Sequence, residues 1–260
     1  MKILVTVTEV AEADDEFEIR GQSIDERYLT YDLNEWDDYA VEEAVQLSEE
    51  YDDVEVVSVT VGPERAEETI RQALAKGVDR AIRVWDDDLA GELLDPGTKA
   101  ALLAAVVEAE EPDFVFSGVQ SADVSFGATG VALATAVGFE WAAVVNEFDL
   151  DLDAGTASIR RELEGGVEEL SEVDLPAVFT IQTGINEPRY ASLRGIRQAQ
   201  QKPLELETPA DLGVDIESAL ALSSLSVPET ESDVTYFEGS PDEAAAQLAT
   251  FLKEEKGVGA

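Results

Sequence analysis

The chain has 260 residues, and its 17 basic and 58 acidic side chains give it a net charge of −41. Hydrophobic residues make up 45% of the sequence, which excludes a disordered acidic tail and is enough for a large core. A chain this negative repels polyanions, so no partnership with nucleic acid is expected. The sequence has no Cys and no His, which excludes disulfides and thiolate metal sites and removes the commonest general base and metal ligand.

Neither a membrane span nor an export signal is expected. The sequence holds no run of about 18 consecutive apolar residues, the length that a transmembrane helix needs. Its apolar start meets an acid at Glu9, too early for the apolar core of a signal peptide. We therefore expect a cytoplasmic protein without direct membrane insertion.

Short apolar runs alternate with longer amphipathic segments in the first half of the chain. The apolar runs predict strands, and the amphipathic segments predict helices. The strands are expected at 3–7, 54–61, 80–84 and 114–117, and the helices at 37–51, 63–76, 95–110 and 127–137. Such alternation is typical of parallel strands joined by crossover helices, so the predicted fold class is α/β with a mostly parallel sheet. The acidic residues 9–34 are expected to form a loop.

The pattern changes after residue 140. Turns rich in glycine separate three segments that are expected to form an antiparallel hairpin region: 141–150, 157–163 and 167–170. A central strand is expected at 176–182, an extended segment at 204–228 and an amphipathic helix at 241–256. We assign residues 1–202 to the α/β domain and residues 203–260 to a C-terminal arm.

The segment from Ser117 to Gly130 follows a predicted parallel strand and leads into a helix. Ligands of open α/β sheets bind at the carboxyl ends of the strands, and a helix N-terminus favours phosphate. An ordinary joint between a strand and a helix would also use such small residues. Asn34 is open to two interpretations as well, because it could cap the helix that follows or bind an adenine or ribose.

The basic segment 186–202 is unusual in so acidic a chain. Pro188 suits the start of a helix there, and apolar residues recur every three positions. The apolar and basic side chains of interest are Arg189, Tyr190, Leu193, Arg194, Ile196 and Arg197. An exposed apolar stripe beside Arg predicts a docking element for a partner. The alternative is a core helix flanked by salt bridges.

Four blocks of the sequence resemble the beta subunit of the electron transfer flavoprotein. The resemblance covers residues 2 to 255 and is most specific at Asn186-Glu187-Pro188-Arg189-Tyr190, followed by Leu193-Arg194-Gly195-Ile196. The other matching positions lie in 33–44, 62–81, 118–130 and 164–178.

The resemblance implies a heterodimer with a larger alpha subunit that holds most of the contacts to a redox FAD. It also implies an α/β domain similar to adenine-nucleotide-binding folds, a C-terminal arm that contacts the alpha subunit, and a structural AMP in the beta subunit. Electrons would arrive from flavin dehydrogenases and leave toward a membrane quinone oxidoreductase. No catalytic side chain is implied.

Two alternatives remain open at this point. One is an electron-bifurcating relative with a second FAD in place of AMP. The other, from a different class, is a nucleotide-sensing binding protein or an ATP-using enzyme of the same superfold.

The resemblance also assigns site residues. It places cofactor contacts at Thr6, Asn34, Val61, Gly118, Ser121, Asp123, Gly127, Ala128, Thr129 and Gly130. It places the partner contacts at Tyr190, Leu193, Arg194, Ile196 and Arg197, with Leu193 at the exposed leucine of the family's recognition loop. The chain departs from the family at Gly127-Ala128, where an Asn or Gln pair is common, and in keeping only Asp123 of a run of Asp.

The acidic excess is spread along the whole chain, which indicates adaptation to a salt-rich cytoplasm, a halophilic origin; the alternative is an ordinary acidic protein. Molar salt shortens the Debye length to roughly 3 Å and screens the self-repulsion of the fold. We expect the melting temperature to rise between about 0.1 M and about 2 M KCl. A non-ionic osmolyte at matched water activity is the control for salt-strengthened burial. An equal melting temperature at both salt concentrations would contradict the halophilic interpretation.

Overall fold

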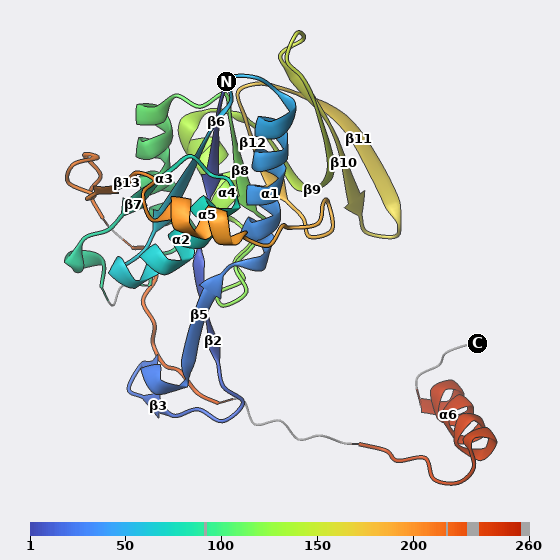
Figure 1. The fold of residues 1–260 in the computed structure, drawn as a ribbon. Coiled ribbons are helices and arrows are strands. Elements are labelled where there is room, and N and C mark those ends of the chain that lie inside the picture. Colours follow the sequence, from blue (N-terminus) through green and yellow to red (C-terminus); the bar gives the residue numbers. More distant parts are fainter. Residues whose placement is uncertain (91–92, 217, 228–233, 256–260) are drawn as a thin grey trace. The chain divides into compact units, whose positions relative to one another are not determined.

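The computed structural model of the chain describes residues 1–90, 93–216, 218–227 and 234–255 (Figure 1). The chain divides into two compact units, Met1–Leu225 and Ser226–Ala260. The first unit is an α/β sandwich built on one large sheet, and the second contains helix α6 (Pro241–Glu255).

A 9-stranded sheet forms the middle layer of the first unit, in the order β11-β10-β9-β12-β8-β1-β6-β7-β13. Every neighbouring pair from β9 to β13 is parallel, whereas β9, β10 and β11 are antiparallel to one another in turn. The strands are β1 (Lys2–Thr6), β6 (Glu55–Val61), β7 (Arg80–Val84), β8 (Phe114–Gly118), β9 (Glu140–Asp151), β10 (Thr156–Leu163), β11 (Val167–Asp174), β12 (Ala177–Ile181) and β13 (Leu204–Glu207). The predicted mostly parallel α/β fold with an antiparallel region is confirmed.

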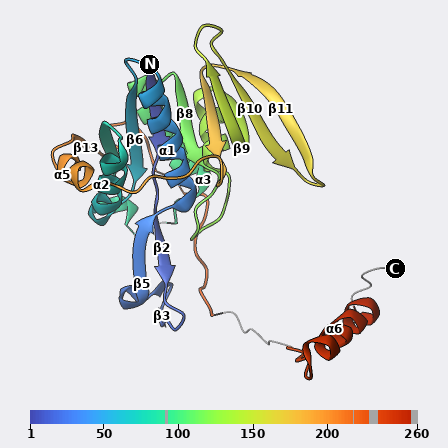
Figure 2. The ribbon, with the colours of Figure 1, turned by 45° about the vertical axis from the view of Figure 1, so that its right-hand side comes forward.

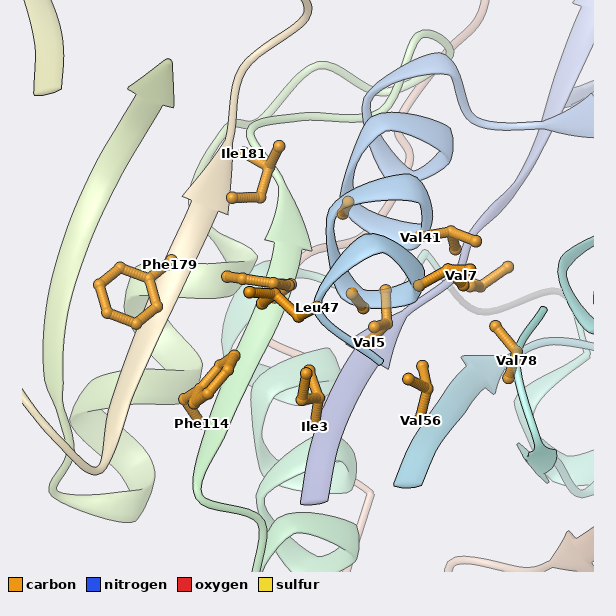
Figure 3. Close-up of a cluster of buried hydrophobic side chains, with 14 of the residues drawn as sticks. Ile3, Val5, Val7, Val41, Leu47, Val56, Val78, Phe114, Phe179 and Ile181 are labelled. Atoms are coloured by element: carbon orange, nitrogen blue, oxygen red, sulfur yellow. The ribbon is translucent and has the colours of Figure 1, made fainter. Parts of the chain in front are cut away.

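Helices cover both faces of the parallel part, which is why its central strands are apolar on both sides. One face packs against α1 (Glu35–Glu50) and α2 (Glu67–Lys76), with α5 (Leu193–Ala199) beside α2. The other face packs against α3 (Pro96–Glu110) and α4 (Thr129–Val137). Figure 3 shows side chains of β1, β8 and β12 meeting Val41 and Leu47 of α1 in the first of these cores.

Four phenylalanines fill the end of this core next to the antiparallel strands. The rings of Phe114, Phe116, Phe148 and Phe179 lie 5.0 to 6.2 Å apart between centroids. Most of the pairs meet edge to face, the geometry that the aromatic quadrupole favours. This cluster joins the parallel core to β9, from which β10 and β11 extend the sheet (Figure 2).

The strand order places a topological switch point between β1 and β8. The chain runs from β1 to β6 and β7 on one side, and then returns to β8 on the other side of β1. Crossover helices of opposite faces therefore diverge between the carboxyl ends of β1 and β8, which leaves a crevice.

The predicted acidic loop at 9–34 is wrong. Strand β2 (Glu9–Ala13) pairs with β5 (Leu29–Leu33), and β3 (Ile19–Arg20) pairs with β4 (Ser23–Ile24), with a short 3-10 helix (Glu26–Tyr28) before β5. Together they form an arm that projects from the carboxyl end of β1 (Figure 1). Val10 alone is buried in β2, and the acidic residues Glu9 and Glu12 hid the alternation that predicts a strand.

Smaller corrections concern where elements begin. The predicted helix 63–76 starts with a 3-10 turn (Glu64–Ala66), and the predicted helix 127–137 starts at Thr129. Another 3-10 turn (Asp87–Leu89) precedes α3. The expected extended segment at 204–228 begins with β13, which pairs with β7 at the edge of the sheet.

The second unit is described by itself. Its helix α6 starts at Pro241, and the hydroxyl of the preceding Ser240 donates to the carboxylate of Glu243 in the first turn. Phe251 of this helix packs against Phe237, with ring centroids 5.8 Å apart. The predicted last residue of this helix, Lys256, lies outside the described residues. Within the described ranges, no helix combines the length and apolar character needed to span a bilayer.

Candidate functional site

A cleft opens at the switch point between the carboxyl ends of β1 and β8. It encloses about 690 Å³, including the part that is open to solvent. Its walls are formed by the ends of strands β1, β6 and β8, the loop before α4, and the first turns of α1 and α3. Its lining residues are Thr6, Val7, Thr8, Asn34, Asp37, Val59, Val61, Leu94, Pro96, Lys99, Leu103, Ser117, Gly118, Val119, Gln120, Ser121, Val124, Phe126, Gly127, Ala128 and Thr129.

The cleft brings together all the predicted cofactor residues except Asp123 and Gly130. Asp123 is exposed, and its carboxylate accepts from the N–H of Val124 over 2.8 Å. Gly130 is buried where α4 crosses β12, and a Cβ there would lie 2.6 Å from Cγ2 of Thr180. The structure therefore explains Gly130 by helix packing, and it does not place either residue in the wall.

Asn34 lines the cleft and does not cap α1 with its side chain. It stands at the cap position of α1, but its side chain makes no capping hydrogen bond. Instead, Nδ2 donates to the carbonyl of Gln120 over 2.8 Å, and Oδ1 accepts from the N–H of Ala122 over 3.2 Å. Asn34 thus holds the loop that forms one wall of the cleft.

Asp37 is the most buried ionisable group of the site, with 2% of its surface exposed. Oδ2 accepts from the N–H of Thr8 over 2.7 Å, and Oδ1 accepts from the N–H of Gly118 over 2.9 Å. Burial raises the pKa of Asp37 to about 6, although both hydrogen bonds act to lower it. Its carboxylate joins the ends of β1 and β8 to the first turn of α1.

Gly118 is required by this clamp. A Cβ at this position would lie 2.4 Å from Oδ1 of Asp37 and 2.7 Å from Cβ of Trp36. Real side chains do not approach so closely, so any larger residue would push α1 away from β8. The close contact at Gly118 therefore serves the protein's own packing.

Sequence reasoning missed several residues of the cleft. Val7 ends the strand predicted at 3–7 and Thr8 follows it, so the rule that ligands bind at strand ends could have found them. Leu94, Pro96, Lys99 and Leu103 come from the start of α3, and no motif marks them. They reach the cleft only because α3 packs against the face of the sheet that faces away from α1.

The segment 186–191 is held against α1 and contains no helix or strand, and α5 begins only at Leu193. The predicted helix start at Pro188 is therefore wrong, because Ser192 caps α5 by accepting from the N–H of Gly195 over 3.0 Å. At the base of the segment, the amide of Asn186 donates to the carbonyl of Tyr39 and to Glu43 over 3.1 and 2.9 Å.

Arg189 makes the main attachment of this segment. Its Nε donates to Glu42 over 2.8 Å, and Nη1 donates to Glu49 over 2.6 Å. Burial alone would raise the pKa of Glu42, but hydrogen bonds from Arg189 and Gln46 outweigh it and leave that pKa below its ordinary value. The pairing fixes the segment at two points of α1 that lie about two turns apart.

The predicted docking residues are exposed beyond this attachment. The exposed fraction is 98% for Tyr190, 78% for Leu193 and 46% for Ile196, and Arg194 and Arg197 are also exposed. The alternative of a core position for Leu193 is therefore wrong. Gly195 lets α5 approach α2, because a Cβ there would lie 2.3 Å from the carbonyl oxygen of Ala75.

Comparison with known proteins identifies the family of this chain. Residues 22–212 match the family profile described as "Electron transfer flavoprotein domain". The chain belongs to the electron transfer flavoprotein beta-subunit family. It is 46% identical to the "Electron transfer flavoprotein subunit beta" of Methylophilus methylotrophus, over 99% of this chain and 100% of that protein.

More distant relatives carry the same name. The human electron transfer flavoprotein subunit beta is 37% identical over 87% of this chain and 86% of its own length. The mitochondrial subunit beta of Arabidopsis thaliana is 34% identical over 88% of this chain and 90% of its own length. The profile match spans both the loop that follows β8 and the segment attached by Arg189.

In this beta subunit, we expect Arg189→Gln to loosen the exposed segment and lower the free energy of unfolding by about 1–3 kcal/mol. The loss leaves Glu42 buried with 5% of its side chain exposed and no cation beside it. The stabilisation should be present above the ordinary pKa of Glu42 and disappear as the pH falls through its lowered folded value. Denaturant unfolding across this range measures it.

Arg194→Gln is the matched control, because Arg194 is exposed and pairs with no carboxylate among the described residues. We expect its free energy of unfolding to stay within about 0.5 kcal/mol of the wild-type value. An equal loss in both variants would show that charge alone, and not the attachment to α1, stabilises the chain.

Proposed function

We propose that this chain is the electron-carrier beta subunit of a heterodimeric electron transfer flavoprotein. In this proposal it pairs with an alpha subunit that holds most of the contacts to FAD, and the C-terminal arm takes part in that pairing. Electrons arrive from flavin dehydrogenases and pass toward a membrane quinone oxidoreductase. The observation that carries the proposal is a ligand cleft at the switch point of the sheet in a chain of this family.

The cleft is proposed to hold AMP. Thr129 and the backbone of residues 127–130 fit the phosphate, because α4 has no side-chain cap and leaves its first N–H groups for an acceptor. Thr6 and Val61, at the ends of β1 and β6, fit the adenosine. The donors are those of a nucleotide site, and the electron-carrying chemistry belongs to the flavin when it is bound.

The chain itself is proposed to position and recognise, with no side chain acting as a catalyst. A protein without His or Cys has few groups for acid–base or nucleophilic work at neutral pH. A cytoplasmic location and a salt-rich cell are part of the same proposal, and they rest on the composition.

The cofactor content of the heterodimer tests this proposal. The full chain is produced together with its alpha subunit, purified in molar KCl and extracted with acid. We expect one FAD and one AMP for each heterodimer. Two FAD would favour the bifurcating alternative, and a chain that binds nucleotide but no alpha subunit would favour a nucleotide-sensing protein.

Leu193→Ala tests the docking role. An exposed apolar anchor at the centre of an interface contributes about 2 kcal/mol or more, so we expect kcat/KM for electron transfer from the dehydrogenase to fall roughly 10- to 30-fold. The melting temperature and the FAD content should not change, because Leu193 is 78% exposed.

Leu170→Ala is the matched control for exposure. Leu170 lies on β11, and 77% of its surface is exposed, nearly the same as for Leu193. Its electron-transfer rate should equal that of the wild type. A wild-type rate in Leu193→Ala, or an early melting transition, would contradict docking through this residue.

A further inference from the structure

The cleft has a charge balance unlike that of the rest of the chain. Although the sequence carries 58 acidic side chains, Asp37 and Lys99 are the only ionisable residues among the described residues that line the cleft. Asp37 already accepts from two backbone N–H groups, of Thr8 and Gly118. The ammonium of Lys99 is therefore the one cationic group among the described lining residues.

Lys99 also differs from most basic residues of the described chain, which are neutralised by partners. Lys2 and Arg80 pair with Glu110, Arg83 pairs with Glu67, and Lys76 pairs with Asp38. Lys202 donates to two backbone carbonyls instead. Lys99 is half-buried, and its ammonium makes no ion pair or hydrogen bond with the described residues.

The backbone that carries Lys99 is firmly held. Asp95 caps α3 by accepting from the N–H groups of Gly97 and Thr98 over 2.8 and 3.1 Å. The same carboxylate accepts from the N–H of Ala219 over 2.9 Å, which ties the start of α3 to the segment after β13. These hydrogen bonds lower the pKa of Asp95 to about 2, with the one from Ala219 as the largest cause. These contacts fix the start of α3, and with it the backbone of Lys99 one turn into the helix.

We propose that Lys99 neutralises the phosphate of the nucleotide in the cleft and makes the site select a phosphorylated nucleoside over the free nucleoside. The proposal rests on the nucleotide-binding function proposed above. A phosphate adds negative charge to a protein of net charge −41, and the two repel each other. The backbone donors near Thr129 offset only part of this repulsion. The unpaired ammonium of Lys99 in the wall of the cleft offsets more of it. A half-buried contact pair keeps its strength in molar salt better than an exposed one does.

The structure also explains why Lys99, rather than the exposed cations of the chain, fills this role. Arg194 and Arg197 are likewise without a carboxylate partner in the described part of the chain, but both lie on α5 and line a different surface hollow. Lys253 is exposed on α6 in the other compact unit. Lys99 alone among these lines the cleft.

The experiment compares AMP with adenosine, because the two differ only in the phosphate. The heterodimer of the full chain and its alpha subunit is stripped of nucleotide, and calorimetry gives the Kd of each ligand in molar KCl. We expect Lys99→Gln to weaken AMP binding about tenfold or more and to leave adenosine binding within about twofold. Lys99→Arg should keep most of the AMP affinity, and Lys253→Gln, with the same change of charge, should keep all of it.

Several outcomes would overturn the proposal. Unchanged AMP affinity in Lys99→Gln, or an equal loss for AMP and adenosine, would show that Lys99 is a solvated or a structural residue while the cleft remains a nucleotide site. A wild type that binds neither ligand would overturn the nucleotide function together with this role.

A second measurement covers the case that Lys99→Gln melts below the assay temperature. The wild type should then prefer AMP to adenosine at both about 0.1 M and about 2 M KCl, because salt screens a half-buried contact pair less than it screens the long-range repulsion by the net charge. A preference that is absent at both salt concentrations would overturn the role of Lys99.

Discussion

The buried carboxylate of Asp37 is the contact on which the cleft depends. It accepts from backbone N–H groups at the ends of two strands, at Thr8 after β1 and at Gly118 in β8. It therefore fixes the first turn of α1 over the switch point, where the open sheet leaves its crevice. Burial raises the pKa of Asp37 to about 6, so the ionised carboxylate costs the folded state some stability. The hydrogen bonds that this carboxylate accepts from Thr8 and Gly118 offset part of that cost.

Two neighbours make this clamp possible. Gly118 has no side chain to collide with Asp37 or Trp36. Asn34, three residues before Asp37, holds the loop at 120–122 through both atoms of its amide. The side chains of Asn34 and Asp37 thus join the start of α1 to backbone groups of β8 and of the loop after it, which keeps the wall of the cleft in place.

Charge is distributed unevenly over this very acidic chain. Cations inside the fold are used to neutralise carboxylates, as Arg80 does between Glu55 and Glu110, and this offsets the repulsion expected of so negative a chain. Arg189 performs the same task for Glu42 and Glu49 and so fixes the base of the exposed segment. Among the described residues of the first unit, cations without an ion pair or a hydrogen-bond partner lie where a ligand or partner is proposed: Lys99 in the cleft, and Arg194 and Arg197 on α5.

The sequence by itself determined the α/β class, the order of most elements and the family. Strand β1 and strand β8 are short runs of apolar residues between turns, and local pattern is sufficient to find them. The block from Asn186 to Tyr190 identified the family before any contact was known. The same local reasoning failed for the β2–β5 arm, because acids at its exposed positions obscure the alternation of a strand.

Only the tertiary structure decided what the site residues do. Asn34 and Gly130 had a functional and a structural interpretation in the sequence, and the contacts with Gln120, Ala122 and Thr180 that distinguish them join residues far apart in the chain. Leu193 had the same ambiguity, since an apolar residue in a helix has no pattern that separates a core position from an exposed anchor. Lys99 had no signal at all, because its place in the cleft follows from the packing of α3 on the sheet, and packing between distant elements is not written in the spacing of nearby residues.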